Sequence, residues 1–263
     1  MSLLALLGSG SVAARLHAGM DPRLRRRSNE ALPRGVGWLV WRGLKRAIEV
    51  LHADAQVLVV HKPAGLLSVP TPNAEGDDLV AALARQGLPA LAVHRLDREV
   101  SGAVLLARDG AVRDQLEDLF RAHAVKKTYW ALAQGRFQRA SGVYKWPILD
   151  DGPNARVSAI GKPSETRWTV LANHPRATEL EIDLVTGRRN QIRLHCAHAG
   201  HPLVGERKYA MGRDAVVHIK SRRVALHAWH LEFPHPATQA LVSVECPLPE
   251  DLLEVRETAA RTR

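Results

Sequence analysis

The chain has 263 residues, enough for one large domain or two small ones with an ample core. Hydrophobic residues make up 46% and charged residues 24%, as in soluble globular proteins, while 37 Lys and Arg against 27 Asp and Glu give a formal charge of +10. This excess favours a polyanionic partner such as nucleic acid, although a generally basic proteome gives the same excess. No apolar run reaches the roughly 18 residues of a membrane span, and Cys196 and Cys246 form no Cys-x-x-Cys pair, which fits a reducing cytoplasm.

Residues 1–35 combine Gly, Ser and Pro with a run of Arg, and we expect a flexible basic arm there. The apolar run at 3–7 has no positive side chain before it and is too short for a secretory signal. Residues 8–28, with Asp21 as their one acid, weakly resemble an organellar transit segment. A disordered arm, or a start codon placed too far upstream, explains the same composition, and we favour these explanations.

A folded domain is expected over 36–252, followed by a tail at 253–263. Hydrophobic periodicity predicts its elements in chain order. In the first half they are a helix at 38–51, a strand at 56–61, a helix at 77–85, a buried strand at 102–107 and a helix at 112–123. Asp77 or Asp78 is the expected cap of the second helix, and Gly87 is its expected end.

In the second half the predicted elements are strands at 129–134, 166–171 and 179–185, a helix at 192–199 and strands at 224–231 and 240–246. Residues 179–185 alternate between apolar and charged side chains, which predicts a strand buried on one face. Gly200 closes the last helix. Strands outnumber long helices and do not alternate with them regularly, so the pattern indicates an α+β protein with a mixed or mostly antiparallel sheet.

Residues 94–102 read HRLDREVSG and lead into the apolar strand that follows. Asp97 lies between Arg95 and Arg98, and nearby positive charge favours the ionised form of a carboxylic acid, so we predict that Asp97 stays ionised. Ser101 and Gly102 give the backbone room to turn before the strand begins. Ionised carboxylates at element ends are common in active sites, although charged loops without a function have the same composition.

This segment resembles the signature of the RluA family of RNA pseudouridine synthases, usually written HRLDxxTSG. Three further segments match that family in the expected order, namely HKPAGL at 61–66, KTY at 127–129 and TGRRNQIR at 186–193. GHPLVG at 200–205, RVALHA at 223–228 and FPHP at 233–236 also fit. The resemblance covers about residues 52–250, and four ordered motifs are far more specific than one.

The resemblance implies the α+β pseudouridine synthase fold, a central mixed, mostly antiparallel sheet with a catalytic cleft and flanking helices. It implies an isomerase that breaks the bond from ribose C1′ to uracil N1 and joins C1′ to C5. Because nothing is oxidised and no group leaves, the reaction needs no cofactor or metal in principle. The expected partner is structured RNA, such as a stem-loop of ribosomal or transfer RNA, and we expect a cytoplasmic monomer that binds no membrane.

The resemblance assigns the catalytic roles to Asp97, Tyr129 and Arg193. In the family the aspartate is essential, the tyrosine packs against the uracil ring, and the arginine pairs with the aspartate. Arg95 matches the arginine that fills the space left by the flipped base, a role that suits its planar guanidinium. The alternative for Arg95 is a surface arginine paired with Glu99. Further substrate contacts are expected from His94, Lys62, Arg188, Gln191 and Lys127.

Helical spacing places Arg189 and Arg193 on one face of the predicted helix, with Ile192 and Cys196 turned to the core. Arg193 is then expected to project away from the core and to meet Asp97 across the cleft. Basic residues that as a group could follow an RNA backbone are Lys126, Lys127, Arg188, Arg189, Arg207, Lys208, Arg222 and Arg223.

Three positions depart from the family pattern: Val100 replaces the usual Thr, Asn190 replaces the usual His, and His61 stands where Asn is common. Val100 loses a hydroxyl that could brace the loop, and Asn190 loses a ring that could stack or titrate. Both bear on fine geometry and substrate choice more than on the reaction. They leave open a non-catalytic RNA-binding protein that keeps the fold, against which the intact Asp97, Tyr129 and Arg193 argue.

A cluster of His and Cys residues invites comparison with a zinc site; its members are His195, Cys196, His198 and His201. Cys196 is expected to face the core, and neither a Cys-x-x-Cys nor a His-Glu-x-x-His pattern is present. We therefore expect no metal site. A zinc-dependent base deaminase is excluded because its His-x-Glu and Pro-Cys-x-x-Cys signature is missing.

Overall fold

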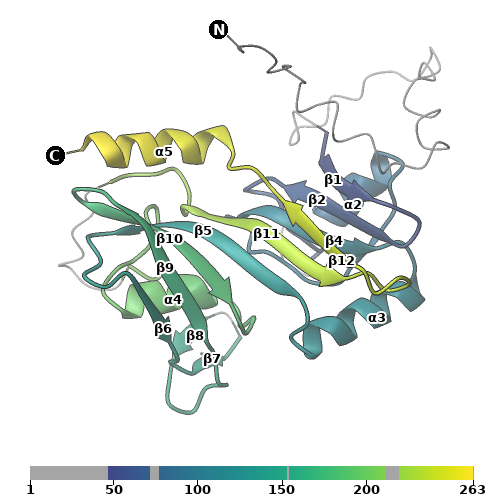
Figure 1. Ribbon diagram of the computed structural model, residues 1–263, viewed down its shortest axis with the longest axis horizontal. Coiled ribbons are helices and arrows are strands. Elements are labelled where there is room, and N and C mark those ends of the chain that lie inside the picture. The colour runs from purple at the N-terminus through teal and green to yellow at the C-terminus, as the bar shows by residue number, and fades with distance from the viewer. Residues whose placement is uncertain (1–46, 72–76, 153, 211–218, 263) are drawn as a thin grey trace, which may run out of the picture. The chain divides into compact units, whose positions relative to one another are not determined.

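The computed structural model describes residues 47–71, 77–152, 154–210 and 219–262 (Figure 1). Its strands are β1 (Glu49–Ala53), β2 (Val57–Lys62), β3 (Leu91–Ala92), β4 (Ser101–Ala107), β5 (Lys126–Gln134), β6 (Ser141–Tyr144), β7 (Ile148–Asp150), β8 (Ala155–Val157), β9 (Thr166–Asn173), β10 (Ala177–Leu184), β11 (Leu226–Pro234) and β12 (Leu241–Glu245). Its helices are α2 (Leu79–Arg85), α3 (Gly110–Arg121), α4 (Gln191–His198) and α5 (Glu250–Arg261). The elements predicted between residues 56 and 246 all form.

One sheet contains ten of these strands, in the order β1-β2-β4-β11-β5-β10-β9-β6, with β12 beside β11 and β3 beside β4. The strands β11 and β4 pair in parallel, and the other pairs among the described strands are antiparallel. In Figure 1, β5 and β11 lie between a wing of β1, β2 and β4 and a wing of β10, β9 and β6. The protein is therefore α+β with a mixed, mostly antiparallel sheet, as predicted.

Strand β2 is buried on both faces of the sheet, which explains why its sequence is continuously apolar rather than alternating. Val57 and Val59 pack into a cluster with Leu116 of α3. Leu58 and Val60 pack on the opposite side, in the larger cluster that underlies the pocket described below. The central strands are thus fixed from both sides.

The parallel contact between β4 and β11 requires a glycine. Gly102 has φ +129° and lies opposite Ala228, where an added Cβ would come within 2.4 Å of the Ala228 backbone nitrogen and oxygen. The sequence predicts a turn at Ser101 and Gly102 before the strand, but both residues belong to β4. Here the glycine permits a close approach of two strands instead of a turn.

Both ends of the chain's folded part differ from the prediction. The prediction of a helix at 38–51 is wrong for residues 49–51, which belong to β1. Residues 38–46 lie outside the described ranges. Pairing of Val50 with Val60 of β2 outweighs the helical spacing, because strand pairing satisfies the backbone hydrogen bonds of this segment, although Val50 itself stays 38% exposed. The expected tail at 253–263 continues helix α5 to Arg261, with Ala259 fully buried.

Strand β10 is less exposed on its polar face than its alternating sequence predicts. Glu179 is buried, and its carboxylate lies 3.3 Å from Trp130 Nε1 and 2.9 Å from His174 Nε2. A buried charge needs such partners. The prediction of β10 as a strand is confirmed. The prediction that only one of its faces is buried is not, because the face with the charged side chains is buried or half-buried as well.

Candidate active site

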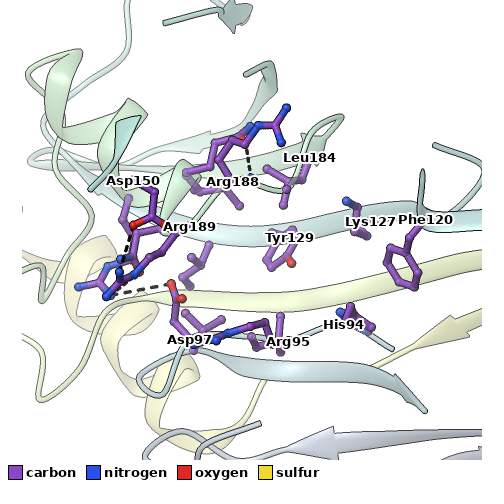
Figure 2. Close-up of a pocket in the computed structure, with 18 of the residues that line it drawn as sticks. His94, Arg95, Asp97, Phe120, Lys127, Tyr129, Asp150, Leu184, Arg188 and Arg189 are labelled. Carbon is purple, nitrogen blue, oxygen red and sulfur yellow. Dashed lines mark hydrogen bonds and ion pairs between the residues drawn. The ribbon is translucent and has the colours of Figure 1, made fainter. Parts of the chain in front are cut away.

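A pocket of about 600 Å³ opens between the loop at 94–100, β5 and the segment that leads into α4 (Figure 2). The predicted site residues that line it are Asp97, Tyr129, Arg193, Arg95, His94, Arg188, Gln191 and Lys127. Apolar lining comes from Leu96, Val100, Phe120, Leu184, Ile192 and Leu226. The sequence motifs, up to about a hundred residues apart, therefore meet at one place.

The loop that carries Asp97 is held from behind by residues 65–68. Ser68 Oγ donates to the Leu96 carbonyl (2.9 Å) and accepts from the Leu96 amide (3.0 Å). The Gly65 amide donates to the Arg98 carbonyl (2.7 Å). The residues on both sides of Asp97 are thus fixed, so its side chain enters the pocket from a rigid base.

Lys62 lies behind this loop and does not line the pocket. Its side chain is fully buried, and Nζ donates to the carbonyls of Pro63 (3.0 Å) and Leu66 (2.8 Å). Burial lowers the pKa of Lys62 to about 7, against the opposing effect of Asp97. The structure therefore places Lys62 as a support for residues 62–68, where the sequence predicts a substrate contact.

His94 anchors the start of the loop to the sheet. Its Nε2 accepts a hydrogen bond from the Leu105 amide of β4 (2.9 Å), and its ring packs 4.8 Å from the ring of Phe120. Burial lowers the pKa of His94 to about 3, so the ring is neutral and Nε2 remains an acceptor. His94 thus continues by its side chain the pairing that β3 makes with β4 through its backbone.

The charge state of Asp97 is set by two opposing effects. Burial raises the pKa of Asp97, and the positive charges of Arg193, Arg95, Lys62 and Arg189 oppose that rise. The prediction that the neighbouring arginines keep Asp97 ionised considers only one of these effects, since burial, which removes the carboxylate from water, acts in the opposite direction. The carboxylate is therefore more basic than an exposed aspartate.

Arg193 does not project away from the core as the helical spacing predicts. Its side chain is 6% exposed and forms a two-point ion pair with Glu206, through Nε (2.6 Å) and Nη2 (2.9 Å). It also contacts Glu99 at 3.0 Å and Asp97 at 3.9 Å. The pairing of Arg193 with Asp97 is present but long, and Glu206 is what holds the guanidinium in place.

Tyr129 reaches into the pocket from β5, as Figure 2 shows. Its side chain is nearly fully buried within the larger core cluster. Burial, and then the nearby charge of Asp97, raise the pKa of Tyr129, so its hydroxyl keeps the proton and can act as a donor. The expected position at a strand end is only approximate, since β5 begins three residues earlier, at Lys126.

Arg189 and Arg193 do not share a helix face, because α4 begins at Gln191 and Asn190 has left-handed backbone angles. Arg189 Nη1 instead forms an ion pair with Asp150 of β7 (3.1 Å). Arg188 Nε donates to the Pro163 carbonyl (3.2 Å). Both arginines still line the pocket.

Gln191 and Lys127 line the pocket in different ways. The Gln191 amide is buried and makes four hydrogen bonds, of which the 2.9 Å bond to the Arg188 amide fixes the segment before α4. Lys127 Nζ lies 5.8 Å from the centre of the Phe120 ring, and burial lowers the pKa of Lys127. Gln191 therefore has a structural role, whereas Lys127 presents a cation to the pocket.

The His and Cys residues of the supposed zinc cluster point into different surroundings. His195 is buried, with Nδ1 2.9 Å from Thr166 Oγ1 and Nε2 2.9 Å from the Trp146 carbonyl. Cys196 is fully buried, as predicted. His201 Nδ1 lies 2.9 Å from the Gln134 carbonyl. Packing and hydrogen bonding account for these side chains.

Three residues that sequence reasoning does not single out are part of the site. Glu206 holds Arg193, Asp150 lines the pocket beside Arg189, and Tyr209 lies under Asn190. Glu206 directly follows the GHPLVG segment, and a single acid after that motif is the one available signal. No periodicity links Asp150 or Tyr209 to Asp97.

The sequence pattern of the RNA pseudouridylate synthase family matches residues 56–198, more than half of the chain. The chain belongs to this family. The match contains Asp97, Tyr129 and Arg193, and of the residues that line the pocket only Leu226 lies outside it. The protein is an RNA pseudouridine synthase, an isomerase, and the reading as a non-catalytic RNA-binding protein is not favoured.

Curated relatives agree over most of the length. The ribosomal large subunit pseudouridine synthase C of Vibrio vulnificus is 33% identical over 223 residues, which are 81% of this chain and 70% of the relative. The dual-specificity RNA pseudouridine synthase RluA of the same organism is 35% identical over 209 residues, 76% of this chain and 82% of the relative.

Solved structures show the same fold. Human RNA pseudouridylate synthase domain containing 1 superposes with a TM-score of 0.66 at 24% identity, covering 77% of this chain and 84% of the human chain. Human RNA pseudouridylate synthase domain containing 4 gives the same TM-score and identity, covering 81% and 93%. The α+β fold implied by the sequence motifs is confirmed. Separately, no helix in the described ranges is long and apolar enough to cross a membrane.

Proposed function

We propose that Asp97 is the catalytic carboxylate and acts either as a nucleophile at the ribose or as a base on it. Two carboxylates line the pocket, Asp97 and Asp150. Arg189 forms a close ion pair with Asp150, whereas the nearest ion-pair distance at Asp97 is the 3.9 Å to Arg193. Asp97 is therefore the carboxylate that is not committed to a close ion pair, and this difference is the observation that carries the assignment.

The pocket around Asp97 suits a uracil that has been detached from C1′ and must turn before C1′ joins C5. Tyr129, Leu226 and Ile192 supply a largely apolar wall against which a flat base can rest. Holding the freed base in place keeps the second step effectively unimolecular. In the net reaction C5 gives up its proton and N1 gains one, so the atoms balance without a further reactant.

We assign to Arg95 the space that the target base vacates when it leaves its stack. Arg95 is exposed at the pocket, and Glu99, its alternative partner, pairs with Arg193 instead (3.0 Å). Its planar guanidinium can stack on a base and bind phosphate at the same time. Figure 2 shows Arg95 and Asp97 side by side along one edge of the pocket.

For the substrate we propose structured RNA of the ribosomal or transfer type. The names of two relatives support this class, since one is a ribosomal large subunit synthase and the other is a dual-specificity RNA synthase. The formal charge of +10 favours RNA binding in general. We further expect a monomer in a reducing cytoplasm, with which the two free, buried cysteines agree.

The test is Asp97→Asn, which keeps the size of the side chain but removes its charge and nucleophilicity. Total RNA from cells lacking the gene, labelled with tritium at uridine C5, releases tritium whenever C5 joins C1′. Asp97→Asn should bind this RNA as the wild type does and release no tritium. Asp150→Asn, the same change in the same pocket, should retain turnover. Turnover by Asp97→Asn would overturn the assignment.

A further inference from the structure

Asn190 stands against Asp97 at the position where the resembled family usually has His. Its amide has one end 2.6 and 3.1 Å from the two Asp97 carboxylate oxygens and the other end 2.7 Å from the Tyr209 hydroxyl. An amide oxygen 2.6 Å from a carboxylate would place two acceptors against each other with no proton between them. With Asp97 ionised, the amide nitrogen therefore faces Asp97 and the amide oxygen accepts from Tyr209; the end that faces Asp97 also lies 3.4 Å from Arg193 Nη1.

The backbone at Asn190 shows that this side chain is committed to the pocket. Asn190 precedes the first residue of α4 and has φ 53° and ψ 25°, a left-handed conformation that asparagine tolerates better than most residues. Asparagine at a helix start usually caps the helix, but the Asn190 side chain makes no capping hydrogen bond. The amide is thus turned away from the helix and toward Asp97.

Tyr209 is itself held, so the contact to Asp97 has a rigid support. Its ring is buried and lies 5.4 Å from the guanidinium carbon of Arg193. Its backbone amide donates to Glu206, the same carboxylate that fixes Arg193. One network thus runs from Glu206 through Arg193 and Tyr209 to Asn190 and ends at Asp97.

We propose that Asn190 is a positioning residue, whose side-chain amide, oriented by Tyr209, holds the Asp97 carboxylate in its ionised form and in one orientation for the reaction. This inference rests on the proposed role of Asp97. It also explains what Asn offers in place of the usual His. An amide donor does not titrate, whereas a histidine would change its charge near pH 6.5.

Other charged groups also face Asp97 and must be kept constant in a test. Arg95 belongs to its own loop, Lys62 to β2, Arg193 to α4 and Arg189 to the segment before it. The hydroxyls of Tyr129 on β5 and Tyr209 also feel its charge. Glu99 and Glu206 act through Arg193. A change confined to residue 190 leaves all of these in place, so differences between variants report the amide.

Two substitutions separate this role from a structural one. Asn190→Gly removes the amide, and glycine adopts the left-handed backbone without strain. Asn190→Asp keeps the shape but places a second carboxylate within 2.6 Å of Asp97, so that the two must share a proton. Gln239→Gly is the matched control, because Gln239 is exposed, lies outside the pocket lining and has a similar positive φ of 56°.

The readout is the pH profile of tritium release from total RNA labelled at uridine C5, measured at saturating RNA. Asn190→Gly should lower the rate at neutral pH by about ten- to a hundredfold, the range expected for one lost hydrogen bond to a charged group. The acidic limb of its profile should move to higher pH, because an ionised Asp97 has lost a donor. Asn190→Asp should move that limb further, and Gln239→Gly should leave rate and profile unchanged.

A purely structural role predicts a different pattern. If Asn190→Gly lowered the rate equally at every pH, or kept the wild-type rate and profile, the proposal would be overturned while Asp97→Asn remained inactive. An active Asp97→Asn would instead remove the catalytic role of Asp97 itself. An acidic limb for Asn190→Asp at or below that for Asn190→Gly would also contradict the proposal.

Discussion

At the scale of single residues, the charge that acts on Asp97 depends on which other groups its neighbouring cations contact, and not only on how many cations are near. Arg193, the cation nearest Asp97 in the family pattern, is shared among Asp97, Glu99 and Glu206, and its shortest contact is with Glu206. Arg193 therefore stabilises the ionised form of Asp97 less than an arginine that contacts Asp97 alone would. Burial then prevails and raises the pKa of Asp97, which suits the role of nucleophile or base that we propose for it.

The role assigned to Arg95 can be separated from phosphate binding. Arg95→Ala should reduce turnover more than binding, because its work begins only after the base has left its stack. An RNA whose target uridine is already unpaired and unstacked omits part of the flipping cost of a few kcal/mol. That RNA should partly rescue Arg95→Ala in a single-turnover assay.

Lys126→Ala and Arg222→Ala serve as controls for that experiment, since both residues lie outside the pocket lining and are exposed. Each should weaken binding to many RNAs alike and flatten its salt dependence, without rescue by the unstacked substrate. Equal losses for Arg95→Ala on stacked and unstacked RNA would mean that Arg95 binds phosphate or orients Asp97.

The sequence predicts which residues meet at the site better than it predicts their contacts. Asp97, Tyr129 and Arg193 line one pocket. Their meeting could be predicted because sequence motifs identify each of them without any knowledge of the geometry. Glu206 and Tyr209 could not be found, because their contacts with Arg193 and Asn190 depend on how the segment after α4 folds back. The position of Lys62 behind the loop could not be predicted for a related reason, since its motif does not show that its ammonium is buried against carbonyls.

At the level of elements, the parallel junction of β4 and β11 positions the loop at 94–100 that carries Asp97, because this loop ends where β4 begins. Gly102→Ala would place a Cβ 2.4 Å from the Ala228 backbone on the neighbouring strand. Backbone cannot rotate out of the way, so the strands must separate, and a loss of more than about 3 kcal/mol in the free energy of unfolding is expected. Urea titration followed by circular dichroism measures it.

Gly87→Ala is the matched control for the junction. Gly87 also has a positive φ, of +73°, but an added Cβ meets nothing within 4 Å. It should therefore cost only about 1 kcal/mol, the strain of a left-handed alanine. If the two variants lost equal stability, the close approach of β4 and β11 would not be what requires Gly102.

Elements with a strong hydrophobic periodicity in their sequence can be predicted, whereas strands that form only because a neighbouring strand pairs with them cannot. Helix α3 and strand β4 have clear patterns and form as predicted. Strand β1 has helical spacing in its sequence and becomes a strand only because β2 offers it an edge. The short strands β7 and β8 leave too few residues for any period to show.

For the whole molecule, buried histidines make stability depend on pH. Burial lowers the pKa of His94 to about 3 and that of His227 to about 4. His227 Nδ1 lies 2.8 Å from Ser101 Oγ, and its Nε2 lies 2.9 Å from the Cys246 carbonyl, so it links β4 and β11 while neutral. Both rings stay neutral in the folded protein at pH values where the unfolded chain binds protons.

Linkage gives the sign of the effect. A histidine whose pKa is lower in the folded than in the unfolded protein leaves the free energy of unfolding at its full value above pH 6.5, and reduces it progressively as the pH falls toward the folded pKa. Between pH 6 and 5, unfolding should take up about 1.7 protons from His94 and His227, a slope of about 2.4 kcal/mol per pH unit. The lowered pKa of the buried His195 adds to this slope and the raised pKa of Asp97 subtracts from it. The lowered pKa values of Glu206 and Asp251 add to it mainly at more acidic pH, and that of Lys62 mainly above pH 6. Urea titrations at pH 7, 6 and 5 measure the slope, and an uptake below one proton would show that these histidines are already charged in the folded protein.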